Sequence, residues 1–231
     1  MSKIRRLLSG VFLLFVTVSL TSCKWAVLDP KGVIAMGEKQ LLIDAVLLML
    51  IVVIPVIIIS VLFAWRYRAS NPKGKYRPNE YHSTMIEVVC WGIPLILVII
   101  LSAMAWISSH RLDPYKPLKA GGKPIVIQVV SLNWKWLFIY PKQNIATINY
   151  LQIPVNRQVE FQITSDAPMN SLEIPRLSGQ IYAMAAMRTK LHIMATDIGV
   201  YRGFSANYSG DGFADMHFKV HVTSENDYQR W

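Results

Sequence analysis

Residues 45–65 read AVLLMLIVVIPVIIISVLFAW and contain no charged side chain. A helix of about 20 apolar residues is long enough to cross the hydrocarbon core of a bilayer. Residues 88–109 form a second charge-free run of similar length. Pro55 and Pro94 lie inside these runs, and membrane helices tolerate proline where neighbouring groups satisfy the freed carbonyl. The two runs predict transmembrane helices over 42–65 and 88–109.

The segment between the two runs, residues 66–87, predicts how the helices are oriented. It carries five arginine and lysine side chains against two glutamates. Short loops this basic stay on the cytoplasmic side of a bacterial membrane. We therefore expect residues 66–87 to be cytoplasmic, and the flanking segments, 23–41 and 110–231, to lie outside the inner membrane.

The first 22 residues read as an export signal. Three basic residues precede an apolar stretch over 7–20, which is too short for a spanning helix and typical of a secretory signal peptide. The following Leu20-Thr21-Ser22-Cys23 resembles a bacterial lipobox. That resemblance implies cleavage after Ser22 and acylation of Cys23, with palmitate among the acyl groups. The alternative is an unmodified cysteine in an uncleaved segment.

Composition excludes several classes of protein. Only 16% of the residues are charged, which is low for a soluble globule. The net charge of +10 would suggest nucleic acid as a partner, but the export signal and the 66–87 loop account for most of it. We therefore expect no nucleic-acid partner. The two cysteines, Cys23 and Cys90, are too few for a disulfide framework.

The remaining residues predict an outer domain. Residues 110–124 are rich in proline and glycine and read as a linker. Residues 125–231 contain short runs in which apolar and polar side chains alternate, as in Val159–Ser165. Such runs, bounded by Pro, Gly, Asn and Asp, favour an antiparallel β-sandwich.

Four stretches carry a resemblance to a known family. They are HSTMIE at 82–87, NWKWLF at 133–138, SDAPMNSLEIP at 165–175, and YRGFSANYSG at 201–210 with the residues that follow to Met216. With the two membrane helices, they resemble subunit II of the haem–copper respiratory oxidases. The resemblance implies that residues 125–231 form an all-β, cupredoxin-like Greek-key sandwich.

The resemblance also implies where a copper site would lie. In the cytochrome c-oxidising branch, two cysteines, two histidines, a glutamate and a methionine hold a dinuclear copper centre. In this sequence the two cysteine positions fall on Ser205 and Ser209, and the two histidine positions fall on Asn170 and Phe213. The glutamate position falls on Asn207, and the methionine position falls on Met216. Only the methionine is kept, and hydroxyl groups cannot replace bridging thiolates. We therefore expect this chain to bind no copper.

Other histidines do not offer a replacement site. His217 and His221 are four residues apart in a run that reads as a strand, where this spacing is about 13 Å. That distance is too long for one metal ion to bridge. His110 and His192 stand alone in the sequence. We expect all four to be packing or polar residues.

Loss of the copper ligands on a retained scaffold resembles the quinol-oxidising branch, and with the lipobox it resembles the bo-type ubiquinol oxidases most closely. Such an oxidase couples quinol oxidation to the reduction of oxygen to water and pumps protons. The resemblance implies haems and a mononuclear copper in subunit I, with subunits I, III and IV, membrane lipids and the quinol pool as partners. It also implies that this chain binds no cofactor and has no catalytic residue of its own. The choice of ubiquinol over menaquinol rests on overall resemblance. A copper-binding cytochrome c oxidase subunit and a membrane-anchored sensor or assembly lipoprotein are the alternatives.

Three residues are candidates for a role in such a complex. Glu87 precedes the second apolar run at its cytoplasmic end. In the family the matching glutamate lies at the entrance of a proton path, so the resemblance implies proton entry, with an interfacial anchor as the alternative. Trp134 and Trp136 match an aromatic strand that faces the copper relay in copper-bearing relatives. Because large aromatic side chains anchor interfaces, we expect these two to act in subunit docking and core packing.

Overall fold

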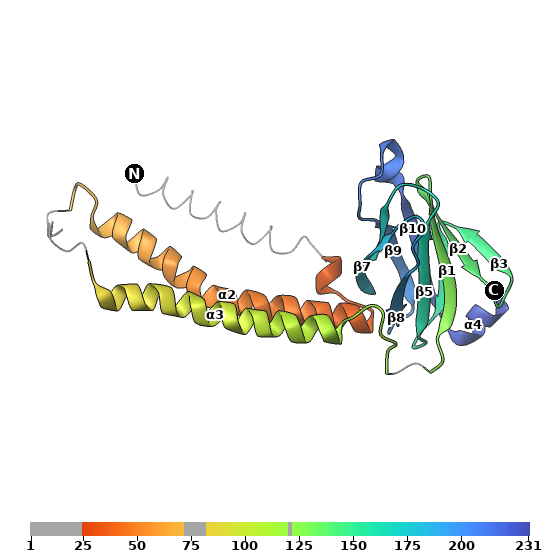
Figure 1. The fold of residues 1–231 in the computed structure, drawn as a ribbon, viewed down its shortest axis with the longest axis horizontal. Coiled ribbons are helices and arrows are strands. Elements are labelled where there is room, and N and C mark those ends of the chain that lie inside the picture. Colours follow the sequence, from red (N-terminus) through yellow and green to blue (C-terminus); the bar gives the residue numbers. More distant parts are fainter. Residues whose placement is uncertain (1–24, 72–81, 120–121) are drawn as a thin grey trace, which may run out of the picture.

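The computed structural model describes residues 25–71, 82–119 and 122–231. Two long helices, α2 (Val33–Arg66) and α3 (Thr84–Arg111), run side by side and extend to one side of a β-sandwich (Figure 1). Both are long and apolar enough to cross a membrane. Most of their apolar side chains are exposed, which a soluble helix pair would not tolerate. The short helix η1 (Ala26–Leu28) precedes α2.

The sandwich consists of two five-stranded sheets packed face to face. The first sheet has the order β3-β2-β1-β5-β8, and its strands are β1 (Ile125–Leu132), β2 (Lys135–Tyr140), β3 (Ile145–Ile148), β5 (Val159–Ser165) and β8 (Thr189–Ile193). The second has the order β4-β10-β9-β6-β7, and its strands are β4 (Tyr150–Pro154), β6 (Asn170–Ile174), β7 (Ser178–Ala183), β9 (Gly199–Ser205) and β10 (His217–Thr223). The short helices η2 (Asp211–Asp215) and α4 (Glu225–Arg230) complete the fold.

The alternation read in the sequence corresponds to burial on the facing sides of the two sheets. In β5 the odd-numbered residues Val159, Phe161 and Ile163 are buried, while the even-numbered residues are partly exposed. Aromatic rings from both sheets meet between them, with Phe138 and Phe218 5.1 Å apart at their ring centres. The core is therefore formed by the inward-facing residues of both sheets.

The expectation of a purely antiparallel sandwich is wrong for two strand pairs. β1 pairs with β5 in parallel, and β4 pairs with β10 in parallel, whereas the other pairs are antiparallel. Between β1 and β5, and between β4 and β10, the chain passes through the opposite sheet. A period of two identifies the buried face of a strand but not the direction of its neighbour, so the pattern could not distinguish these cases.

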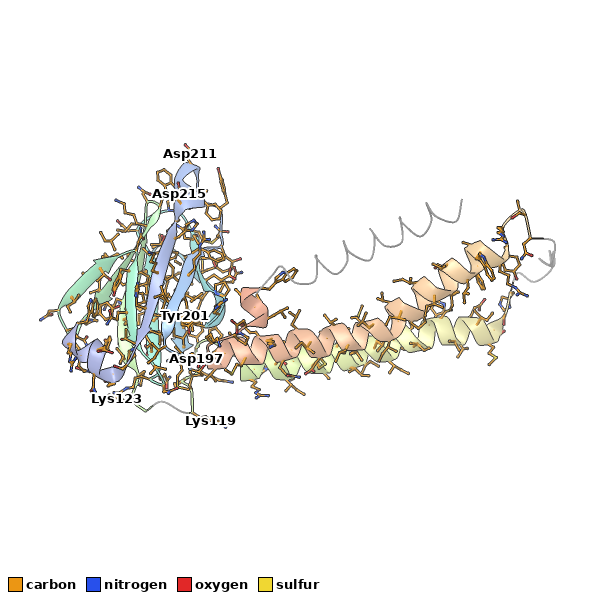
Figure 2. The ribbon with its side chains drawn as sticks, turned by 180° about the vertical axis from the view of Figure 1, so that it is seen from behind. Lys119, Lys123, Asp197, Tyr201, Asp211 and Asp215 are labelled. Atoms are coloured by element: carbon orange, nitrogen blue, oxygen red, sulfur yellow. The ribbon has the colours of Figure 1, made fainter. Side chains whose placement is uncertain are left out.

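The residues before α2 attach the helix pair to the sandwich. Gly32 forms a bridge with Ala195, and the amide of Val33 donates to the carbonyl of Met194 (3.1 Å). The ammonium group of Lys31 lies 3.0 Å from the carboxylate of Asp197, which Figure 2 marks at the foot of the sandwich beside the helices. α2 therefore extends nine residues beyond the start of the expected transmembrane span at residue 42, and the sandwich holds its first turn.

The linker is attached from the other side. The buried ring of His192 lies with its Nδ1 3.0 Å from the carbonyl of Pro114, and its backbone amide donates to the same oxygen. The Nε2 of His192 lies 3.5 Å from the carboxylate of Glu160. Burial opposes ionisation of Glu160, but the hydrogen bond from Gln162 and the nearby Lys190 and His192 hold the pKa of its carboxyl below the usual range. His192 thus fixes the linker to the sandwich, in agreement with a packing role.

Candidate functional site

The loop between β9 and β10 is the centre of the candidate site. It contains η2, which projects from one end of the sandwich and is marked by Asp211 and Asp215 in Figure 2. Of the six positions at which the resemblance places copper ligands, Ser205 ends β9, and the loop itself carries Asn207, Ser209 and Phe213. Met216 closes the loop, and Asn170 begins β6.

Hydrogen bonds join the loop to the start of β6. The Ser205 hydroxyl donates to the side-chain oxygen of Asn170 across 2.9 Å, and both residues are buried. The side-chain amide of Asn207 donates to the carbonyl of Met169 (3.0 Å), and the amide of Ala206 donates to that of Ser171 (2.9 Å). Two segments that a metal ion joins in copper-bearing relatives are here joined by neutral hydrogen bonds.

Trp134 closes the other side of the loop. It lies in the turn between β1 and β2 with a positive φ of 56°, and its indole N–H donates to the carbonyl of Ser209 (3.2 Å). Gly212 lies directly under the ring, so a side chain at that position would overlap the indole. Gly210 has a φ of 107°, a conformation that side chains rarely adopt. The indole and these two glycines together fix the path of the loop.

The six positions do not fit a dinuclear copper centre. Their side chains offer an amide, two hydroxyls, a second amide, a phenyl ring and one thioether. Copper of this type requires bridging thiolates and imidazoles, and only Met216 supplies a soft donor. The Ser205 hydroxyl already bonds Asn170, and the Met216 side chain is fully buried in the core. Within the described residues, no group of three or more His, Cys, Asp or Glu side chains is arranged for a metal ion.

A cavity of about 670 Å³ opens beside the loop. Glu173, Arg202 and His217 line it together with aromatic side chains of the loop and β9. Burial raises the pKa of the Glu173 carboxyl. The Nε2 of His217 lies 2.8 Å from the guanidinium of Arg202, and its buried Nδ1 has no hydrogen-bond partner among the described residues. With one acid and two basic groups, the lining favours neither anions nor cations.

The structure separates the two tryptophans. Trp136 is fully buried in the sandwich, where its ring lies edge-on to Phe218 with 6.0 Å between the ring centres. It is a core residue and has no surface to offer to a partner. Trp134 is 42% exposed, and Met169 and Tyr208, which flank the same loop, are also exposed. A docking role is therefore confined to Trp134 and its neighbours.

The remaining histidines lie apart. His217 and His221 are both on β10, and the ring of His221 stacks on Tyr150 with 4.6 Å between centres. His110 lies in the last turn of α3, with its Nδ1 2.8 Å from the carbonyl of Trp106. These three rings contact different groups, and none is placed beside another.

A second candidate site lies at the far end of the helix pair. Glu87 is in the first turn of α3, and its carboxylate lies 3.2 Å from the Nε2 of His82. Both side chains are more than half exposed. His82 belongs to the HSTMIE motif, and its spacing of five residues from Glu87 is not that of neighbours on one helix face. The turn before α3 brings the imidazole back to the carboxylate. Cys23 lies outside the described residues, and Cys90 is exposed on α3.

Comparison with known proteins identifies the family. The chain is 53% identical over 212 residues to cytochrome bo(3) ubiquinol oxidase subunit 2 of Pseudomonas aeruginosa, an overlap of 92% of this chain and 64% of that protein. It is 50% identical over 214 residues to ubiquinol oxidase subunit 2 of Acetobacter aceti, with 92% and 70% covered. The chain belongs to the ubiquinol oxidase subunit 2 family. It spans about two thirds of the length of these relatives.

More distant members and solved structures complete the comparison. Quinol oxidase subunit 2 of Bacillus subtilis is 38% identical over 222 residues, with 95% of this chain and 69% of that protein covered. No protein-family model matches the chain. A cryo-EM structure of a heme-copper terminal oxidase dimer matches 60% of this chain and 99% of the solved chain, with 18% identity and a TM-score of 0.49. The periplasmic domain of cytochrome oxidase subunit II from Bradyrhizobium japonicum matches 50% and 94%, with 18% identity and a TM-score of 0.47.

Proposed function

We propose that this chain is a copper-free subunit 2 of a proton-pumping quinol oxidase in the aerobic respiratory chain. Its roles there are to form a scaffold on subunit I and to contribute to proton entry. The observation that carries the proposal is the 53% identity to a ubiquinol oxidase subunit 2 over 92% of the chain. Further support comes from the hydrogen bonds of Ser205 to the Asn170 side chain and of the Asn207 side chain to the Met169 carbonyl, at positions where a copper relay would need thiolates and imidazoles.

The loss of copper agrees with a quinol as the electron donor. A donor protein outside the membrane needs a metal relay in the outer domain, whereas a lipid-soluble quinol can meet subunit I within the bilayer. Quinol oxidation and oxygen reduction are then reactions of subunit I, which would hold the haems and a mononuclear copper. Subunits III and IV would complete the complex. This chain contributes two helices and the outer cap, and we assign Trp134 to the contact between cap and subunit I.

The proposal includes a membrane topology. α2 and α3 cross the bacterial inner membrane, the basic residues 66–87 lie in the cytoplasm, and the sandwich lies in the periplasm. Residues 1–22 are removed as a signal peptide, and acylated Cys23 anchors the new N-terminus to the outer leaflet. Each buried methylene of the acyl chain adds about 0.8 kcal/mol to membrane binding. The attachment of Lys31 to Asp197 supports this arrangement, since it keeps the segment before α2 next to the sandwich.

Glu87 and His82 form the proposed proton entrance. In this topology both side chains lie at the cytoplasmic end of α3 and face water, from which they can take protons. The carboxylate can accept a proton from the imidazole across 3.2 Å and release it toward subunit I.

The overall function is tested by purification through a tag placed after Trp231. We expect the tagged chain to co-purify with haem, and the preparation to take up oxygen when supplied with ubiquinol. A haem-free chain would contradict the proposal and favour the sensor or assembly lipoprotein. Stoichiometric copper bound by the tagged chain itself would favour the cytochrome c oxidase alternative. Oxygen uptake with menaquinol but not with ubiquinol would support a quinol oxidase whose substrate is menaquinol.

The proton entrance is tested by Glu87→Gln in the same complex. We expect turnover to fall by about tenfold, the effect of raising a barrier by about 1.4 kcal/mol, with the haem content unchanged. Glu87→Asp retains the carboxyl group and should recover much of the rate. The matched control is Glu225→Gln, which removes an exposed carboxyl at the start of α4 and should leave turnover unchanged. Normal turnover in Glu87→Gln would show that this glutamate is only an interfacial anchor.

A further inference from the structure

A cavity of about 880 Å³ lies where the helix pair meets the sandwich. α2 and α3 form two of its walls, and the segment over 112–119 forms the third. Leu41 and Met104, nearer the middle of the helices, line its inner part, and Arg111, Lys116 and Lys119 line its outer part. Figure 2 shows Lys119 beside the sandwich-side ends of the helices. The inner part also contains Gln40 and Asp44, whose side chains bond each other, so the cavity is mixed in polarity toward the middle of the helices and mainly cationic toward the sandwich.

The cations of this cavity are not neutralised by ion pairs. None of Arg111, Lys116 and Lys119 lies within 4.0 Å of a carboxylate in the described part of the chain. The Lys116 ammonium group donates instead to the carbonyl of His110 (3.0 Å). The two carboxylates in the lining have other partners, since Asp44 accepts from Gln40 (2.8 Å) and Asp113 accepts from the amide of Tyr115 (3.0 Å).

This arrangement suits a ligand that has an anionic end and an apolar end. We infer that the cavity binds the headgroup of an anionic phospholipid, with the phosphate on Arg111, Lys116 and Lys119. The glycerol would lie against Leu41 and Met104, and the acyl chains would continue along the exposed apolar faces of α2 and α3. Pockets of 300–1,000 Å³ are typical of specific small-ligand sites. The inference rests on the proposed insertion of the two helices in the membrane.

Charge and position both favour a lipid over other anions. A free phosphate would use the three cations but leave the inner part of the cavity, beside Leu41 and Met104, unoccupied. A phospholipid in the leaflet on the sandwich side already holds its phosphate at the level where the apolar runs of the helices end. Each basic side chain near a membrane surface strengthens the binding of anionic lipid by about fivefold.

The test is native mass spectrometry of the purified oxidase complex, titrated in detergent with phosphatidylglycerol or phosphatidylcholine. We expect the wild-type complex to retain phosphatidylglycerol in preference to phosphatidylcholine. The double variant Arg111→Gln/Lys116→Gln should bind phosphatidylglycerol about 30-fold more weakly. The charge-preserving variant Arg111→Lys/Lys116→Arg should bind it nearly as well as wild type, which excludes a folding defect as the cause.

The matched control removes two cations elsewhere. Lys135→Gln/Lys142→Gln changes the start of β2 and the turn after it, in the part of the sandwich opposite the helices (Figure 1), and should leave lipid binding unchanged. Equal binding of both lipids, or unaltered binding by the Arg111→Gln/Lys116→Gln variant, would overturn the inference. Displacement of the lipid by inorganic phosphate at equal concentration would reassign the cavity to free anions. Oxygen uptake is measured on the same preparations, so failure of the proposed function is seen separately from failure of lipid binding.

Discussion

The hydroxyl of Tyr140 joins the two sheets of the sandwich, and its removal is a sharp test of the fold. Tyr140 ends β2 and is fully buried. Its hydroxyl donates to the carbonyl of Gln152 (3.0 Å) and accepts from the amide of the same residue (2.9 Å). Gln152 lies on β4, an edge strand with only β10 beside it in its sheet. The hydroxyl thus takes the place that a further strand would occupy.

Tyr140→Phe retains the ring and removes both hydrogen bonds. The ring contact with Trp231, 5.3 Å between centres, is available to phenylalanine as well. Two buried backbone groups of Gln152 lose their partner, and each such group costs about 1–3 kcal/mol. Water at the sheet edge can relieve part of this cost. We expect the free energy of unfolding to fall by about 2–4 kcal/mol.

The assay is urea unfolding of the full chain in detergent, followed by tryptophan fluorescence, because the buried Trp136 becomes solvated when the sandwich opens. The matched control is Tyr208→Phe, which removes an exposed hydroxyl that has no hydrogen bond within the described residues. That substitution should change the stability by less than about 0.5 kcal/mol. A loss below about 1 kcal/mol in Tyr140→Phe would refute the reasoning, because it would mean that the Gln152 backbone does not need the hydroxyl.

The buried hydroxyl of Tyr140 also predicts that the folded protein loses stability at alkaline pH. Burial raises the pKa of Tyr140, which the hydrogen bond to Gln152 only partly offsets. The folded protein therefore keeps this proton at a pH where the unfolded chain, with a pKa of about 10, releases it. Stability is fully present below about pH 10 and falls as the pH rises toward the folded-state pKa. The decline should be shallower in Tyr140→Phe, and a pH-independent difference between the two proteins would contradict the raised pKa.

Two further substitutions test the attachments at either end of the sandwich. A methyl group on Gly32 would overlap the carbonyl of Leu177, so Gly32→Ala should detach the segment before α2 and expose it to limited proteolysis at several times the wild-type rate. An unchanged cleavage rate would show that the attachment adjusts without strain. Ser205→Ala removes the hydrogen bond to Asn170 and should lower the free energy of unfolding by about 1–2 kcal/mol. In a double-mutant cycle with Asn170→Ala, a coupling energy near zero would count against a direct bond between the two side chains.

The sequence was sufficient for the membrane helices and the sandwich, since both depend on one-dimensional patterns. It did not indicate that the helix continues from the expected span back to Val33, because Ile34 and Ala35 are buried by contacts with the sandwich that no local pattern reports. It also treated Trp134 and Trp136 as equivalent members of one alternating run. The turn between β1 and β2 places Trp134 outside the strand with a positive φ, so only Trp136 faces the core. Tertiary contacts therefore determine where α2 begins, and turn geometry determines which tryptophan faces the core.

In the candidate site, too, some features could be predicted from the sequence and others could not. The donor chemistry of the loop could be read from the sequence, because a serine is not a thiolate in any geometry. The hydrogen bond between Ser205 and Asn170, and the approach of His82 to Glu87, join residues whose spacing corresponds to no periodic element. Such contacts depend on how a turn or a pair of sheets folds back, and only the three-dimensional structure provides that.

The structure also shows what joins the two segments in which the resemblance places copper ligands. A metal ion joins the two loops of such a site by a few strong bonds, and its loss alone would leave buried polar groups unpaired. Here the hydroxyl of Ser205 donates to the side chain of Asn170, and the side-chain amide of Asn207 donates to the carbonyl of Met169. The indole of Trp134 holds the loop from the opposite side. The surface formed by Trp134, Met169 and Tyr208 is thereby retained. We propose that this surface docks in the oxidase complex by its shape, a role that requires no metal.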